Sequence, residues 1–358
     1  MNNLDNLSYI KNLDAGKTLA SIHFLPDQCE AAWNEVKKIE LPADYHNFSQ
    51  ILFCGMGGSA FGGRMIKSLY SAALKAPVDV VSDYRLPAYV DRHTLIIAAS
   101  YSGNTEETIF CCQEALKLGA KIIGITSGGK IESLLRDAQK PVYVFSPELN
   151  PSKQPRLGQG YMQLGQIAIL NALGILSVSE TEVYSLVSLL KKNDKLLSEQ
   201  VGQERNSAKQ TALQLEDKIV GIIAAEFLTG AVHIIRNSLH ETAKHFADYF
   251  ILPEANHHLL EGLKYPEVIR KNLIFLLINS ELYSEKIFKR LNLTREVIEK
   301  NSLKTREIKL QSSSKLHQVF ELIQLGSFIT FYLAILHSVD PAKIPWVDYF
   351  KKRLARLH

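Results

Sequence analysis

The sequence predicts an α/β fold made of two tandem units, each a parallel sheet flanked by helices. Short runs rich in Val, Ile and Leu alternate with longer segments whose apolar residues have helical spacing, and the alternation occurs in each half of the chain. Apolar strands that are separated by helices form parallel sheets covered on both faces. The length of 358 residues and the apolar share of 46% suit two sizeable cores.

The first half opens with a segment that predicts one or two helices and reaches to about residue 38. Five strand-like runs follow, at residues 50–54, 78–81, 94–99, 121–125 and 142–145. Apolar spacing between them predicts helices over residues 62–74, 108–118 and 131–136. Pro151 and Pro155 then interrupt the rhythm and indicate a loop between the two halves.

The second half repeats the pattern after a helical stretch at residues 162–197, which breaks near Gly174. The predicted strands are 218–224, 249–252, 272–278 and 306–310, and the predicted helices are 230–245, 285–301, 316–337 and 345–357. The chain thus divides into an N-terminal helical segment (1–40), a first α/β domain (41–150), a linker loop with connecting helices (151–215) and a second α/β domain with C-terminal helices (216–358).

Composition excludes several classes of protein. Charged residues make up 22%, the net charge is only +4 and the basic residues are scattered, so we expect no nucleic-acid partner. No apolar run approaches the ~20 residues of a membrane-spanning helix, so we expect no membrane partner and a cytoplasmic protein. The four cysteines have neither metal-ligand spacing nor a disulfide framework, which predicts buried thiols in a reducing compartment and no metal site.

The most informative segment is Ser100-Tyr101-Ser102-Gly103-Asn104-Thr105, which lies between a predicted strand and a predicted helix. Its three short hydroxyl side chains and several backbone N–H groups converge at the helix N-terminus. Unpaired amides and the helix dipole favour an anion at such a position. The segment therefore predicts a binding site for a phosphate group.

A glycine-rich turn, Gly55-Met56-Gly57-Gly58-Ser59-Ala60, follows the first predicted strand. Glycines let the backbone approach an anion closely, and Ser59 adds a hydroxyl. Taken alone, the turn is also a plain tight connection or a dinucleotide fingerprint with Asp79 or Asp83 as the ribose-binding acid, which would make the protein an NAD(P)-dependent dehydrogenase. The hydroxyl turn two strands later favours a phosphomonoester, because a dinucleotide has no need of those side chains.

The two turns together resemble the sugar isomerase (SIS) domain over about residues 50–145. Further motifs resemble the bifunctional phosphoglucose/phosphomannose isomerases over nearly the whole chain: Asp83-Tyr84-x-Leu86-Pro87, Gln154-Pro155-Arg156, Glu241-x-x-Lys244, Pro253-Glu254-Ala255-Asn256-His257, and Asp340-Pro341 leading to Lys351. This resemblance implies two tandem sugar isomerase domains of the αβα type and a homodimer without metal or other cofactor. The implied reaction interconverts glucose 6-phosphate, and mannose 6-phosphate, with fructose 6-phosphate.

The resemblance also implies roles for particular residues. The implied phosphate-binding residues are Gly58, Ser59, Ser100, Ser102 and Thr105, and the implied catalytic residues are Arg156, Glu241, His257 and Lys351. Glu241 would move a proton between C2 and C1 through a cis-enediol intermediate, and Arg156 would stabilise the enediolate oxygens. His257 and Lys351 would serve ring opening, for which a histidine is suited because its charge changes near neutral pH.

Each of these residues also has a plainer interpretation. Glu241 fits a solvated carboxylate that pairs with Lys244 on a helix face. Arg156 fits a clamp between domains, and His257 a surface residue. Lys351, like its neighbour Lys352, fits a solvated terminal helix, and its offset after Asp340-Pro341 favours it over Lys352 as the active lysine.

Two positions depart from the family pattern in the catalytic half of the chain. Thr242 stands where the pattern has Asn, and His258 replaces the Asn that follows the motif histidine. They leave binding of a phosphosugar unaffected, but they bear on turnover and substrate breadth. A non-catalytic sugar-phosphate sensor is therefore the alternative function.

Overall fold

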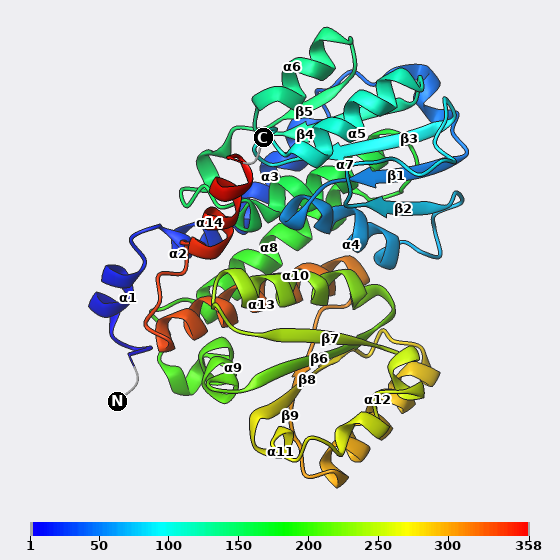
Figure 1. Cartoon of the computed structure of the whole chain (residues 1–358). Helices are drawn as coiled ribbons and strands as arrows, with labels where there is room; N and C mark the ends of the chain where they lie inside the picture. Colours follow the sequence, from blue (N-terminus) through cyan, green and yellow to red (C-terminus); the bar gives the residue numbers. More distant parts are fainter. Residues whose placement is uncertain (1–2, 357–358) are drawn as a thin grey trace.

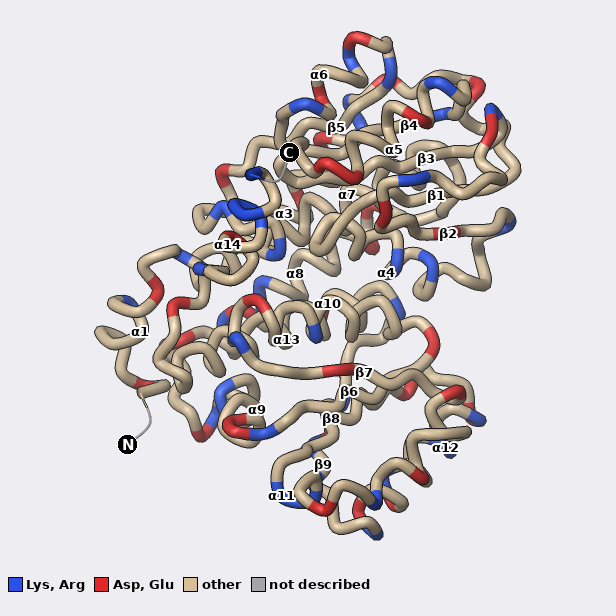
Figure 2. The backbone as a smooth tube through the Cα atoms, viewed as in Figure 1, with Lys and Arg blue, Asp and Glu red and all other residues tan. Residues whose placement is uncertain are grey.

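The structure is a computed structural model that describes residues 3–356. Two parallel sheets lie in two α/β halves, with helices packed between the sheets and on their outer faces (Figure 1). This arrangement confirms the predicted fold class. Lysines, arginines and carboxylates are intermingled over both halves, as the scattered charge of the sequence indicates (Figure 2).

The first sheet contains five parallel strands in the order β2-β1-β3-β4-β5. Their bounds are Gln50–Cys54 (β1), Val78–Val81 (β2), Thr94–Ala99 (β3), Lys121–Thr126 (β4) and Val142–Val144 (β5). Alternate side chains of β1 point to opposite faces: Phe53 joins the large core shared with the second half, and Leu52 joins a smaller outer core.

Helices cover both faces of this sheet. The outer core contains residues of α5 (Glu106–Lys117) and α6 (Gly129–Asp137). The inner face is covered by α4 (Phe61–Leu69), α7 (Gly165–Ala172) and the N-terminal α3 (Leu25–Val36). Two short helices, α1 (Leu7–Leu13) and α2 (Thr18–His23), precede α3, so the opening segment holds three helices where the sequence predicted one or two.

The second sheet contains four parallel strands in the order β7-β6-β8-β9. Their bounds are Ile219–Ala225 (β6), Ala247–Leu252 (β7), Leu273–Asn279 (β8) and Lys304–Lys309 (β9). The helices of this half are α9 (Ser207–Leu215), α10 (Thr229–Glu241), α11 (Ile269–Asn272), α12 (Glu285–Lys300) and α13 (Lys315–Leu336). Helix α10 packs between β6 and β7 on one side and α13 on the other, and α12 covers the opposite face (Figure 1).

The two halves share one continuous apolar core. Helices α8 (Glu180–Leu197) and α13 lie within it, and α10 packs directly on α4. A Cβ atom on Gly230 of α10 would lie only 2.4 Å from the main chain of Met65 in α4, so the glycine permits this close approach.

By length and composition, α13 is long and apolar enough to cross a membrane, so the expectation that no apolar run approaches this length was wrong. Within the most apolar 18-residue part of this helix, 83% is buried inside the protein. It packs on α8, α9 and α10, as a core helix does.

Short helical turns complete the chain. They are η1 (Ala43–His46), η2 (Gly57–Ala60), η3 (Pro147–Leu149), η4 (Pro155–Leu157), the π-turn η5 (Gly160–Leu164), η6 (Gln203–Arg205), η7 (Glu226–Leu228), η8 (Glu254–His257) and η9 (Glu261–Leu263). The terminal helix α14 spans Pro345–Leu354, and the predicted end of this helix at Leu357 lies outside the described residues. All four cysteines are free and buried, as predicted.

Candidate active site

The glycine turn forms η2, directly after β1. Gly57 has a φ of +49°, which favours glycine, and a Cβ on Gly58 would touch the main chain of Arg156 at 3.4 Å. Ser59 is buried, and its Oγ accepts a hydrogen bond from the backbone N–H of Tyr101 at 3.0 Å. The glycine turn is therefore joined to the hydroxyl turn after β3 and to the loop that carries Arg156.

The hydroxyl turn connects β3 to the N-terminus of α5. Oγ of Ser100 lies 2.8 Å from Oγ1 of Thr105, and Oγ of Ser102, which is exposed, accepts from the N–H of Asn104 at 3.3 Å. Thr105 is the N-cap residue of α5, yet its side chain makes no capping hydrogen bond. The first-turn amides of α5 thus lack a side-chain partner, which suits an anion at this helix end.

A third turn, after β4, is used for structure. The Oγ1 of Thr126 donates to the carbonyl of Gly128 at 2.7 Å, and the Oγ of Ser127 donates to the carbonyl of Tyr101 at 2.7 Å. The carbonyl of Gly128 also faces Gly103 closely enough that a Cβ there would clash. These hydroxyls hold the neighbouring turns in place.

Arg156 is the centre of the polar contacts between the two halves, and only 2% of it is exposed. Its Nε donates to Thr242 Oγ1 at 3.0 Å and its Nη1 to Gln154 Oε1 at 2.9 Å. Its Nη2 donates to the carbonyls of Pro341 and Ala342, both at 2.8 Å. Burial lowers the pKa of Arg156, while Glu241 and Asp340 oppose that change, so the guanidinium stays charged.

Glu241 is the last residue of α10, and its Oε2 lies 3.5 Å from Nη1 of Arg156. Its side chain remains 29% exposed, so it is not sealed from solvent. Thr242, the departure from the family pattern, supplies the oxygen that accepts from Arg156. Sequence reasoning did not foresee this contact, because it joins two residues that are far apart in the chain.

Lys244 lies beside this pair but does not form the helix-face ion pair that the sequence allowed. Helix α10 ends at Glu241, and Lys244 has a φ of +53°. Its ammonium donates to the carbonyls of Thr242 and Asp340. Burial and the nearby Arg156 lower the pKa of Lys244 to about 8. No sequence pattern indicated this perturbation, because it depends on the fold.

His257 lies far from Glu241 within one chain. It is exposed at the end of η8, beyond the carboxyl end of β7, whose last residue Leu252 pairs with Ala225. Ala225 precedes α10, whereas Glu241 ends it, and 13 residues of helix span about 20 Å. The neighbouring His258 is also exposed and forms an ion pair with Glu254 at 3.3 Å.

Lys351 lies on α14, which starts shortly after the Pro341 and Ala342 carbonyls that bind Arg156. Both Lys351 and Lys352 are exposed, and neither has an ion-pair partner among residues 3–356. Trp346, Tyr349 and Phe350 of the same helix are exposed as well, at 59–80%. The structure thus brings Arg156 and Glu241 together with the glycine turn, and leaves His257 and Lys351 on the surface.

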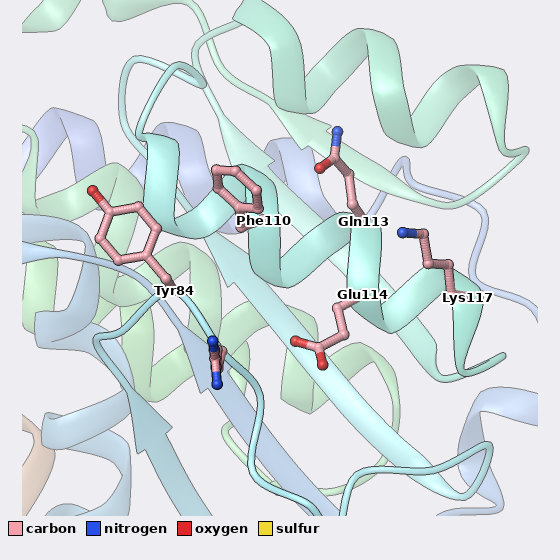
Figure 3. Close-up of a pocket in the computed structure, with 6 residues that line it drawn as sticks. Tyr84, Phe110, Gln113, Glu114 and Lys117 are labelled. Carbon is pink, nitrogen blue, oxygen red and sulfur yellow. The ribbon is translucent and has the colours of Figure 1, made fainter. Parts of the chain in front are cut away.

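A shallow depression of about 340 Å³ lies on the outer side of α5 and contains none of the predicted site residues. Figure 3 shows Tyr84 beside Phe110, with Glu114 and Lys117 further along α5. The Tyr84 hydroxyl donates to Glu106 at 3.2 Å, which ties the Asp83-Tyr84 loop to the start of α5. Within residues 3–356, no group of three or more His, Cys, Asp or Glu side chains is arranged to hold a metal ion.

Comparison with known proteins identifies the domain family of both halves. The SIS domain family matches residues 45–148, and the family described as the bacterial phospho-glucose isomerase C-terminal SIS domain matches residues 204–354. Both sheets therefore belong to SIS domains, as the resemblance implied. The crystal structure of a hypothetical protein from Thermus thermophilus superposes with a TM-score of 0.75 at 15% identity, covering 98% of this chain and 93% of that one, and shows a shared fold.

Two curated relatives match over nearly their whole length. Both are named bifunctional phosphoglucose/phosphomannose isomerase. The protein of Caldicellulosiruptor bescii is 30% identical, with 94% of this chain and 98% of the relative covered. That of Aquifex aeolicus is 29% identical, with 91% and 97% covered. With both SIS domains present and the match extending over most of its length, the chain belongs to the bifunctional phosphoglucose/phosphomannose isomerase family.

Proposed function

We propose that this protein is an aldose–ketose isomerase that interconverts glucose 6-phosphate, and mannose 6-phosphate, with fructose 6-phosphate. One observation carries the proposal: the main chain of Arg156 lies against Gly58 of the glycine turn, and its guanidinium lies beside Glu241. The turn to which we assign the phosphate and the carboxylate to which we assign proton transfer therefore both contact one buried cation.

In this proposal the phosphate is bound at the junction of the glycine and hydroxyl turns. The residues assigned to it are Gly58, Ser59, Ser100, Ser102 and Thr105. Ser59 already uses its oxygen as an acceptor, which leaves its O–H free to donate to a phosphate oxygen. The uncapped first turn of α5 adds backbone donors. Contacts remote from the reacting carbons supply positioning energy.

Glu241 is the proposed base. It removes the proton from C2 of the open-chain aldose while the carbonyl oxygen at C1 takes up a proton, which gives the cis-enediol. Glu241 then returns its proton to C1 and the hydroxyl at C2 gives up its own, which leaves the C2 carbonyl of the ketose, so one proton moves in net terms from the C2 oxygen to the C1 oxygen. Arg156 stabilises the negative charge that develops on the enediolate oxygens. The reverse steps return fructose 6-phosphate to glucose 6-phosphate or mannose 6-phosphate, according to the face of C2 that is protonated.

Ring opening is assigned to His257 and Lys351, with a homodimer as the active form. Because His257 and Glu241 lie at opposite ends of α10 in one chain, we assign to each cleft His257 of the partner subunit. Lys351 reaches its own cleft if α14 folds over Arg156. We also propose that the enzyme is cytoplasmic and needs no metal, so EDTA is expected to leave turnover unchanged.

A coupled assay that follows glucose 6-phosphate formation from fructose 6-phosphate tests the proposal. Glu241→Gln is expected to lower turnover by about 10²–10⁴-fold while phosphosugar binding persists. Glu261→Gln, which alters an exposed carboxylate in η9, is the matched control. Phosphosugar binding without wild-type turnover would identify a sensor instead, and NAD binding without phosphosugar affinity a dehydrogenase.

A further inference from the structure

A second depression lies where the two halves of the molecule meet, away from the candidate active site. It has a volume of about 290 Å³ and is lined by Arg64, Lys67, Ser68, Asp79, Val80, Thr229, Gly230, His233 and Tyr249. These residues come from α4 and the edge strand β2 of the first half, and from α10 and the edge strand β7 of the second. In Figure 2, basic positions on α4 lie on the side that faces the second half.

Two arginines at this junction have unused donors. The side chain of Arg64 forms no hydrogen bond or ion pair with any described residue, and its Nε is buried without a partner. Nε of Arg236, one turn along α10 from His233, is buried without a partner as well. Arg236 lies over the ring of Tyr249 at 5.3 Å. Buried donors of this kind carry a free-energy cost unless a ligand or solvent satisfies them.

His233 adds a further donor. Its Nδ1 lies 3.3 Å from Nη2 of Arg236 and 3.1 Å from the hydroxyl of Tyr249. A guanidinium can only donate, so Nδ1 is the acceptor and the ring proton resides on Nε2. Burial, together with Arg64 and Arg236, lowers the pKa of His233 to about 4, so the imidazole is neutral at neutral pH and offers one N–H.

The charges of the depression are not balanced. The lining residues Arg64 and Lys67 supply two positive charges, and Asp79 supplies one negative charge. Arg236 does not line the depression but lies against its lining residues His233 and Tyr249, where it adds a third positive charge. The Asp79 carboxylate accepts from the hydroxyl of Tyr89 at 2.8 Å and lies 3.7 Å from Lys67. The charged lining residues therefore sum to one positive unit (two minus one). With the neighbouring Arg236 the sum is two, which a phosphoryl dianion neutralises and a single carboxylate does not.

We propose that this depression is a binding site for a phosphoryl-bearing small anion, separate from the phosphate-binding turns of the candidate active site. Arg64 and Lys67 of α4 bind it from the first half. From the second half His233 of α10 binds it, and Arg236 holds the His233 ring in place and adds positive charge behind it. Helix α4 begins directly after the glycine turn, and α10 ends at Glu241. The anion thus bridges the two helices that carry groups of the candidate active site, and its binding stabilises the junction of the halves.

Calorimetric titration with pyrophosphate tests this site in a Ser100→Ala/Thr105→Val protein, whose active-site turns have lost two hydroxyls. Pyrophosphate is expected to bind this protein and to raise its unfolding temperature. Arg64→Gln is expected to weaken the binding at least about tenfold, since it removes charge-assisted hydrogen bonds. Asp79→Asn is expected to strengthen it, because it removes the opposing charge. Misfolding cannot produce both effects.

Arg270→Gln is the matched control, since it removes an exposed arginine from α11 at the same cost in charge. Equal binding by the Arg64→Gln and Arg270→Gln proteins would overturn the proposal. The proposal would also be overturned if the Arg64→Gln/Lys67→Gln double substitution dissociated an oligomer, because these cations would then belong to a subunit interface. If the Ser100→Ala/Thr105→Val protein does not fold, the same titrations are made with Arg64→Gln, Asp79→Asn and Arg270→Gln in the wild-type background. Neither readout depends on turnover, so failure of this site and failure of the proposed isomerase activity are distinguishable.

Discussion

The guanidinium of Arg156 and the carboxylate of Glu241 approach to 3.5 Å although 85 residues separate them in the chain. The other contacts of Arg156 are to Thr242, Gln154 and two main-chain carbonyls, which hold the guanidinium in one orientation. The η4 loop, the end of α10 and the segment before α14 therefore meet at a single side chain.

Arg156→Lys is expected to damage both stability and turnover. An ammonium cannot reproduce the planar fork, so at least two of the present acceptors lose their partner. We expect a loss of about 3 kcal/mol in the free energy of unfolding, since each unsatisfied buried acceptor costs about 1–3 kcal/mol. Urea unfolding measures the first effect and the coupled isomerase assay the second. A Lys variant with wild-type stability would show that the buried contacts of Arg156 contribute little.

Thr242 tests whether the departure from the family pattern matters. Thr242→Val keeps the shape but removes the acceptor for Nε of Arg156, so we expect a loss of about 1–3 kcal/mol in the free energy of unfolding. Thr242→Asn restores the residue of the family pattern and keeps an oxygen acceptor, and it is expected to retain most of the turnover. If the Val and Asn variants behave alike, the hydrogen bond to Arg156 is not what the position provides.

Thr105→Val tests the hydroxyl turn. The substitution removes Oγ1, which lies 2.8 Å from Oγ of Ser100, with little change in volume. We expect the affinity for glucose 6-phosphate to fall about tenfold or more, because a hydrogen bond to a charged group contributes about 1.5–3 kcal/mol. Isothermal titration measures it. Thr181→Val, which alters an exposed threonine in the first turn of α8, is the matched control for loss of a threonine hydroxyl.

Much of the fold was predictable because its signals are local. Every predicted strand of the first sheet starts at the predicted residue, since each is a short apolar run bounded by polar residues. Helix α10 was predicted to reach residue 245 but ends at Glu241. The apolar spacing continues past the helix, whereas the backbone turns at Lys244, where φ is positive.

The contacts of the candidate active site were predictable only in part. The glycine and hydroxyl turns follow strands, and parallel strands place such turns at one edge of the sheet. The contacts of Arg156 with the Pro341 and Ala342 carbonyls involve main-chain atoms, which carry no mark in the sequence. The separation of His257 from Glu241 was not predictable either, because it depends on the length and direction of α10.

His23 predicts a pH-dependent contribution to stability. Burial alone would lower the pKa of His23, but its two ring N–H groups donate to Asp194 at 2.8 Å and Glu199 at 3.2 Å, and the pKa rises to about 9. Because the folded pKa exceeds the unfolded value of about 6.5, the stabilisation is fully present below pH ~6.5 and disappears as the pH rises through ~9.

His23→Gln measures this contribution. The difference in the free energy of unfolding between wild type and variant is expected to be largest below pH ~6.5. It is expected to be at most about 3 kcal/mol, and solvent around the partly exposed His23 reduces it further. It should decline steadily up to pH ~9. His93→Gln, an exposed histidine, is the control. A difference that grows with pH would contradict the assignment of the charged imidazole.

The position of His257 leads to a prediction about subunits. If each cleft combines Glu241 of one chain with His257 of the other, Glu241→Gln and His257→Gln homodimers are both inactive for lack of one group. In a mixed dimer, one cleft lacks both groups and the other has both.

Random mixing of the two variants makes half of the dimers mixed, and each mixed dimer has one intact cleft of two. The mixture is therefore expected to recover about one quarter of the wild-type turnover, because two-fold symmetry generates two equivalent clefts per dimer. The measurement is the coupled assay after joint refolding or co-expression, with each variant alone as the control. If the mixture recovers no turnover, either Glu241 and His257 of the same chain serve the same cleft or His257 is not needed. Turnover by the His257→Gln homodimer alone would identify the second case. Mixing restores neither of the mutated side chains. Any turnover that the mixture regains therefore comes from dimers that contain one subunit of each variant.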